Sequence, residues 1–215
     1  MMPTAWAFLD PRGMGITLSL SAALLALVLL ITHRALGRRL PGMQPAAFGL
    51  LLASAGFALN MLQSWLLPVM GLVLAVVCMV SGVALVLGGT RQLRGLPVRP
   101  GPLAASCLAS LAIALWFGVW MPDARWRIGL LSLLLAALAL LLARTAWDEA
   151  RPQLRAGMRL MALLGMVFAV LMGLRGVAAA LGQIETTVTP TLVNAASMLA
   201  AGVLPVVDIA SNIVS

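Results

Sequence analysis

The chain has 215 residues, of which 62% are hydrophobic and 9% charged, and its formal net charge is +8. A soluble globular domain is about half apolar and about a quarter charged, so this composition excludes a large soluble core and indicates an integral membrane protein. The apolar residues form unbroken runs instead of alternating with polar ones. This pattern excludes a membrane β-barrel and predicts helical spans.

Seven apolar runs predict seven transmembrane helices in one membrane domain that covers residues 1–215. The predicted spans are residues 13–35, 45–67, 68–90, 103–121, 127–144, 156–181 and 191–214. No basic cluster precedes the first span, so a cleavable signal peptide is not expected. Residues 91–102 contain three prolines and two glycines, and we expect a rigid, non-helical loop there.

The arginines give an orientation. Ten of them fall in the loops after spans one, three and five, and four fall on the opposite side. Because cytoplasmic loops are enriched in basic residues, we expect the amino terminus outside and the carboxyl terminus in the cytoplasm. The predicted fold class is an all-α integral membrane protein, a seven-transmembrane helical bundle. The same bias explains the positive charge better than binding to nucleic acid, which we do not expect.

The chain lacks the residues that several kinds of functional site require. The chain has no lysine, which excludes a retinal Schiff base. Its single histidine, His33, lies at a helix end among arginines, so neither a haem nor a metal site is expected. Cys78 and Cys107 lie at different depths of different runs, and we interpret them as packing residues and not as a disulfide. No catalytic motif is present, so the sequence predicts neither an enzyme nor a bound cofactor.

The turn between spans four and five, residues 116–127 (WFGVWMPDARWR), is rich in tryptophan and charge. Tryptophans are ordinary anchors at a membrane interface. Asp123 follows Pro122 and precedes Arg127 by four residues, which predicts a helix N-cap with an acid–base pair. The alternative is that Asp123, Arg127 and Trp120 line an outward-open ligand pocket.

Other polar residues within the spans are further candidates. Arg175 interrupts an apolar run, and a charge at such a position is a functional candidate by default, with Glu185 or Asp123 as its partner. If span six ends near Arg175, the side chain instead extends to the headgroups. Asn60 and Gln63 either line the same outer pocket or form hydrogen bonds between helices.

Span seven is the least apolar span. Asp208 and Asn212 are four residues apart and share one helix face. Hydrogen bonding to neighbouring helices is one interpretation of this face, and transmission of a signal is the other.

Several short motifs resemble the multi-span sensory region of bacterial GGDEF-type diguanylate cyclases over about residues 9–180. The motifs are residues 9–12 (LDPR), Pro41-Gly42, residues 88–95 (GGTRQLRG), Trp116-Phe117, Pro122-Asp123, Arg127, Ser132 and Arg175. The resemblance implies a signal-receiving module in the bacterial inner membrane that controls a cytoplasmic cyclase domain in cis or in trans. It also implies a homodimer and allows an unknown small ligand.

Two features depart from this family. No GG[DE]EF signature occurs before Ser215, so the chain would be the sensory module alone, and its last span is more polar than is usual there. A small transporter or channel is the alternative function, and it predicts two similar halves, which are not evident in the sequence. A structural membrane assembly subunit is a third possibility.

Overall fold

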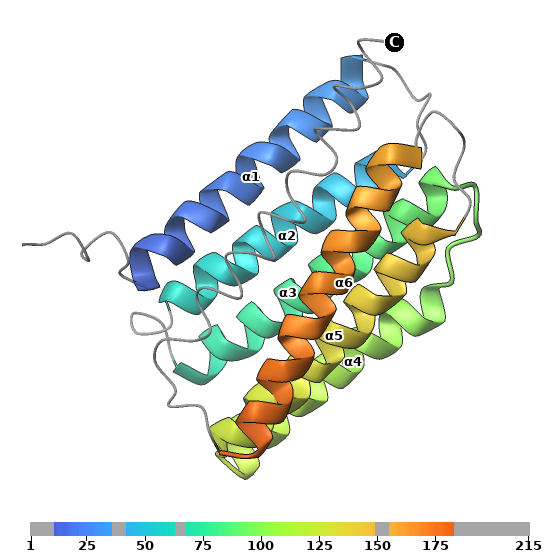
Figure 1. Cartoon of the computed structure of the whole chain (residues 1–215). Helices are drawn as coiled ribbons and strands as arrows, with labels where there is room; N and C mark the ends of the chain where they lie inside the picture. Colours follow the sequence, from blue (N-terminus) through green and yellow to red (C-terminus); the bar gives the residue numbers. More distant parts are fainter. Residues whose placement is uncertain (1–10, 36–41, 63–67, 149–154, 183–215) are drawn as a thin grey trace, which may run out of the picture.

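The computed structural model describes residues 11–35, 42–62, 68–148 and 155–182. These residues form six α-helices and one π-helical turn, and they contain no strand, which confirms the all-α prediction. The helices lie side by side (Figure 1). Their bounds are α1 (Pro11–Ala35), α2 (Met43–Met61), α3 (Pro68–Leu93), α4 (Pro100–Leu115), η4 (Trp116–Trp120), α5 (Ala124–Trp147) and α6 (Arg155–Ala180). The predicted seventh span lies outside the described residues.

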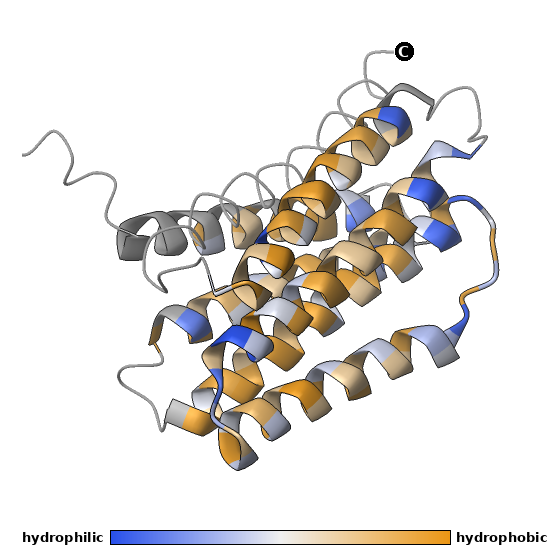
Figure 2. Ribbon diagram, turned by 60° about the horizontal axis from the view of Figure 1, so that its bottom comes forward, coloured by the Kyte–Doolittle hydropathy of each residue, from blue (hydrophilic) through white to orange (hydrophobic). Residues whose placement is uncertain are grey.

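Four of the described helices are long and apolar enough to cross a membrane. They are Val69–Leu93, Pro100–Trp120, Ala124–Trp147 and Met158–Ala180. Hydrophobic residues follow one another along these helices (Figure 2), and many of them are exposed, for example Leu108 at 66% and Leu174 at 65%. Because leucines stay exposed in this way where lipid replaces water, these helices identify a multi-pass membrane protein.

Proline and glycine set the helix ends between α3 and α4. Helix α3 continues to Leu93 and ends at Gly95, whose φ of 73° is the left-handed conformation that glycine adopts without strain. Helix α4 begins with Pro100 in its first turn, where the missing N–H is no loss. The predicted loop is therefore shorter than expected, because both helices extend into it.

Helices α2 and α3 form an antiparallel hairpin whose backbones touch. A Cβ added at Gly49 would lie 2.6 Å from the carbonyl oxygen of Gly82, and one added at Gly82 would lie 2.5 Å from the oxygen of Gly49. Gly42 and Gly89 approach each other in the same way, one heptad further along. Since small residues allow such close packing in membranes, this stripe of glycines explains why α2 pairs with α3.

Helices α5 and α6 form a second hairpin with the same pattern. Gly129 faces Gly176, where an added Cβ would lie 3.3 Å from the Gly176 oxygen. Towards the other end of the hairpin, a Cβ added at Gly165 would lie 3.3 Å from the Cβ of Ala143. Contact through alanine holds these two helices slightly further apart than α2 and α3.

The helix starts and contact glycines of the two hairpins share one sequence spacing. Helix α3 starts at Pro68 and α6 starts at Arg155. The same number of residues separates Gly42 from Gly129, and Gly89 from Gly176. It separates Gly95 from Gly182 as well, and these two glycines have φ values of 73° and 71°. The N–H of each glycine donates to the carbonyl three residues before it, Gln92 in one copy and Ala179 in the other.

The copies have opposite directions. Arg94, just after the end of α3, contacts the end of α5, and α6 starts at that same end of the bundle. Helix α6 therefore runs antiparallel to its equivalent, α3 (Figure 1). The α2–α3 and α5–α6 hairpins therefore have inverted topologies.

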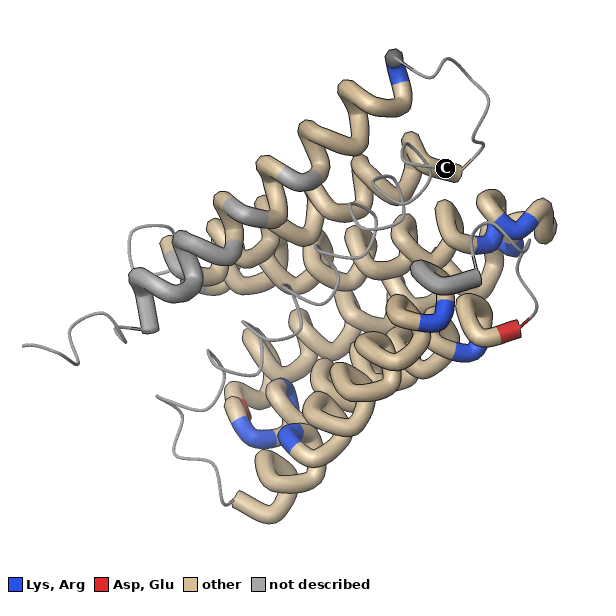
Figure 3. Tube along the Cα trace, turned by 45° about the horizontal axis from the view of Figure 1, so that its top comes forward, with Lys and Arg blue, Asp and Glu red and all other residues tan. Residues whose placement is uncertain are grey.

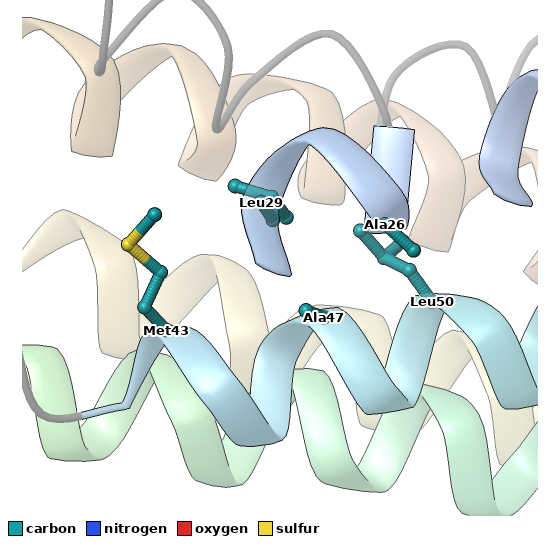
Figure 4. Close-up of a cluster of buried hydrophobic side chains, with 5 residues drawn as sticks. All are labelled: Ala26, Leu29, Met43, Ala47 and Leu50. Carbon is teal, nitrogen blue, oxygen red and sulfur yellow. The ribbon is translucent and has the colours of Figure 1, made fainter. Parts of the chain in front are cut away.

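Helix α1 packs along α2. Their contact is a cluster of Ala26, Leu29, Met43, Ala47 and Leu50 (Figure 4). Nearer the start of α1, the hydroxyl of Ser54 donates to the carbonyl oxygen of Ser19 at 2.7 Å, and the hydroxyl of Ser19 donates to the carbonyl oxygen of Ser54 at 3.0 Å. These reciprocal bonds fix the register of the two helices.

The joint between the two hairpins is built from larger side chains. Val80 and Leu87 of α3 pack against Leu135 and Leu138 of α5. The backbones therefore stay apart at this joint, in contrast to the contact inside each hairpin.

Candidate functional site at the tryptophan end

Charged side chains gather at the two ends of the bundle, and an apolar middle separates them (Figure 3). We call one end the tryptophan end; it contains residues 116–127, the last residues of α6 and the end of α2. The opposite end, the arginine end, contains Arg91, Arg94, Arg99, Arg144, Asp148 and Arg159. This separation is the one expected when the middle of each helix lies in hydrocarbon.

A π-helical turn and a cap build the turn at the tryptophan end. The N–H of Met121 donates to the carbonyl oxygen of Trp116 at 2.9 Å, which closes the wide turn, and Pro122 then ends the helix. The side chain of Asp123 accepts a hydrogen bond of 2.9 Å from the N–H of Arg125. The N-cap prediction is confirmed, but Asp123 forms no ion pair with Arg127 within the described part of the chain.

Arg125 connects the start of α5 to the end of α6. Its guanidinium carbon lies 3.2 Å from the Cβ position of Gly182, the glycine at which α6 ends. The last carbonyls of a helix carry partial negative charge, so a cation at this place is favourable for the end of α6. The sequence reasoning did not single out this contact.

The predicted site residues that the structure describes lie at this end of the bundle, but on different helix faces. Arg127 is half-buried and lies about 200° around α5 from Arg125, since each residue turns a helix by about 100°. Arg175 is half-buried and directly precedes Gly176, which faces Gly129. Asn60 is half-buried near the end of α2. Gln63, Glu185, Asp208 and Asn212 lie outside the described residues.

The tryptophans point outward. Trp120 is 78% exposed, Trp116 and Trp126 are half exposed, and the rings of Trp116 and Trp120 lie 5.5 Å apart. Amphipathic rings exposed at one level of the bundle suit the headgroup region of a bilayer. Single π-helical turns also concentrate at functional sites, and this one positions both rings.

The arginine end contains a second polar contact between helices. The guanidinium of Arg94 donates to the carbonyl oxygen of Thr145 and lies 3.8 Å from the carboxylate of Asp148. The Arg94 side chain is 12% exposed, so this bond is largely shielded from solvent. It joins the end of α3 to the end of α5 across the joint between the two hairpins.

Comparison with family models, with curated proteins and with solved structures finds no match for this chain. The fold and the site therefore define its class by themselves: an all-helical, multi-pass membrane protein. Its described part contains two inverted helix hairpins, and tryptophans and charged residues gather at one end of it. The resemblance to cyclase sensory regions stays a prediction from the motifs.

Proposed function

We propose that the chain is a membrane-embedded signal-receiving module that regulates a cytoplasmic diguanylate cyclase, attached or separate. The observation that carries the proposal is the position of the polar groups. Asp123, Arg125, Arg127 and Arg175 meet the tryptophans at one end of the bundle, while the arginine end carries the positive excess. The cytoplasmic preference of arginine directs the tryptophan end outward, where a ligand or a membrane state can act.

The proposed mechanism uses the contact between α5 and α6. A ligand that binds near Arg125 and Arg175 more tightly in one helix arrangement shifts the population towards that arrangement. Because α5 and α6 touch through small residues, they move together, and the shift reaches the arginine end. The seventh predicted span, with Asp208 and Asn212, then passes it to the cyclase in a homodimer.

The test is a fusion of the full chain to a diguanylate cyclase domain placed after Ser215 and expressed in bacterial membranes. We expect Arg175→Ala and Asp123→Ala to change the cellular level of cyclic di-GMP at equal protein abundance. Arg99→Ala, an exposed arginine at the opposite end, is the control and should leave the level unchanged. Unchanged output from both site variants would sink the proposal.

A small transporter or channel is the second candidate, because the two inverted hairpins favour it. Many transporters consist of two inverted repeats with a substrate site between them near the bilayer midplane. Cys107 lies at the contact between α3 and α4, with its sulfur 3.3 Å from the hydroxyl of Ser81. Alternating access would expose Cys107 to membrane-impermeant maleimide from both sides. The sensory proposal expects no labelling from either side in a Cys78→Ala background.

A further inference from the structure

The α5–α6 hairpin has an open flank on one side of its helix contact. In the contact, Ala143 of α5 lies against Gly165 of α6, and Ala146 packs with Met158. Each residue turns a helix by about 100°, and the two helices run antiparallel. The residues that directly follow the contact residues on both helices therefore lie on the same side of the hairpin, which we call the α5–α6 flank.

Along most of its length the α5–α6 flank is lined by exposed apolar side chains, each directly after a buried residue. They are Leu133 and Leu140 on α5 and Leu163, Met166 and Val170 on α6, and each is between 43% and 56% exposed. At the arginine end the flank continues with Arg144 and Arg159, both exposed, and with Trp147. Because Ala146 packs with Met158, the two arginines differ in height by about one helical turn or less.

The two arginines of the flank form no ion pair within the described part of the chain. Asp148 stands four residues after Arg144, but its carboxylate lies 3.8 Å from the guanidinium of Arg94, which comes from α3. It is the one acidic residue that the structure describes at the arginine end. Arg144 and Arg159 therefore leave a local excess of positive charge at the edge of an apolar surface.

We propose that the α5–α6 flank binds an anionic phospholipid. Its phosphate lies between Arg144 and Arg159, and its acyl chains lie along the exposed apolar side chains of the flank. Guanidinium groups donate paired hydrogen bonds to phosphate, and basic pockets between membrane helices suit anionic headgroups. A zwitterionic lipid would bring a further cation to this place, so the charge favours a lipid with a net negative charge.

The dimensions of the flank fit one leaflet of a bilayer. Along α5, the rise from Arg144 to Leu133 is about 16 Å, close to half of a hydrocarbon core of about 30 Å. Trp147 lies beyond Arg144, towards the end of the helix, where an amphipathic ring suits the headgroup level. The binding of this lipid does not depend on the proposed sensory function.

Lipid titration of the purified full chain in mild detergent tests the site. Native mass spectrometry measures the Kd of phosphatidylglycerol and of phosphatidylcholine, which has the same phosphate but no net charge. The site variants are Arg144→Gln and Arg159→Gln. The matched control is Arg99→Gln, which removes an exposed arginine at the same end, at the start of α4. In a second arm, photoactivatable phosphatidylglycerol is cross-linked to the wild-type chain in phosphatidylcholine vesicles, and the attached residues are mapped by peptide mass spectrometry.

We expect each site variant to weaken phosphatidylglycerol binding by about fivefold, as for the loss of one cation beside an anionic headgroup. Arg99→Gln should leave this Kd unchanged, and phosphatidylcholine should bind all variants alike. Cross-links should concentrate within residues 133–147 and 159–170. Equal losses in all three variants would show a general attraction of charge and overturn the proposal, as would cross-links mainly on α3 or α4. Displacement of the lipid by inorganic phosphate, compared with chloride at the same ionic strength, would assign the arginines to a free anion instead.

Discussion

The glycine contact between α2 and α3 makes a quantitative prediction at Gly49. A Cβ at this position would lie 2.6 Å from the Gly82 oxygen and 2.8 Å from the Val86 nitrogen. Ordinary van der Waals contact begins at 3.4 Å, so the two backbones must separate by roughly 0.8 Å to admit one methyl group. Both obstructing atoms belong to the backbone, and no side-chain rotation relieves them.

Two effects of Gly49→Ala oppose each other. Overpacking of a close contact costs about 1–3 kcal/mol. Alanine favours a helix over glycine by about 1 kcal/mol. Gly173→Ala is the matched control, because Gly173 lies inside α6 with nothing within 4 Å of its Cβ position. It gains the helix preference without the collision, so the difference between the two variants isolates the collision.

The assay is reversible unfolding in mixed micelles of mild detergent and dodecyl sulfate, followed by circular dichroism. We expect Gly49→Ala to be less stable than Gly173→Ala by about 1–3 kcal/mol. The double variant Gly49→Ala, Gly82→Ala should cost less than the sum of the two singles, because the helices separate once for both methyl groups. If Gly49→Ala proves as stable as Gly173→Ala, the backbone contact does not hold the hairpin together.

Three further substitutions test the polar contacts by the same unfolding measurement. Ser54→Ala removes the bond that its hydroxyl donates to the Ser19 carbonyl oxygen, while the bond from the Ser19 hydroxyl to the Ser54 backbone carbonyl remains. It should cost about 1 kcal/mol, whereas Ser106→Ala, which loses only bonds within its own helix, should cost less. Arg94→Met should cost about 1.5–3 kcal/mol through the lost bond to Thr145, and equal stability of Arg94→Met and Arg99→Met would contradict that role. Asp123→Ala should cost about 0.5–2 kcal/mol, and Asp123→Ser should restore most of it; failure of serine to do so would mean that the carboxylate does more than cap α5.

Helix class and helix ends were accessible from the sequence, because unbroken apolar runs and prolines are local signals. Pro100 and Pro122 marked the ends of α4 to within a few residues. The partners of each helix were not accessible in the same way. When every face of a helix is apolar, hydrophobic periodicity no longer shows which face is inside.

The repeat of the two hairpins was not predicted from the sequence for a related reason. It survives in the residues that touch, where glycine and alanine replace each other, and in the glycines that end α3 and α6. The lipid-facing residues between them differ freely, since lipid accepts any apolar side chain. Arg125 and Arg127 illustrate the same limit at the site. Both are arginines in the first turns of α5, so the sequence does not distinguish them. The cap at Asp123 fixes where α5 starts, and this start places Arg125 beside the end of α6.

The contrast between the two kinds of helix contact indicates where the molecule can change shape. Inside the α2–α3 hairpin, backbone packs against backbone at the glycines, which leaves no space for even one added methyl group. Between α3 and α5, valine and leucine side chains can change rotamers, so small shear movements are possible there. Arg94 bonds across this joint at the arginine end, and Arg125 joins α5 to α6 at the other. If the α5–α6 hairpin is displaced near Arg125, the hydrogen bond from Arg94 to Thr145 must lengthen or change its geometry. We therefore expect this bond to be the first contact at the arginine end to respond to such a displacement.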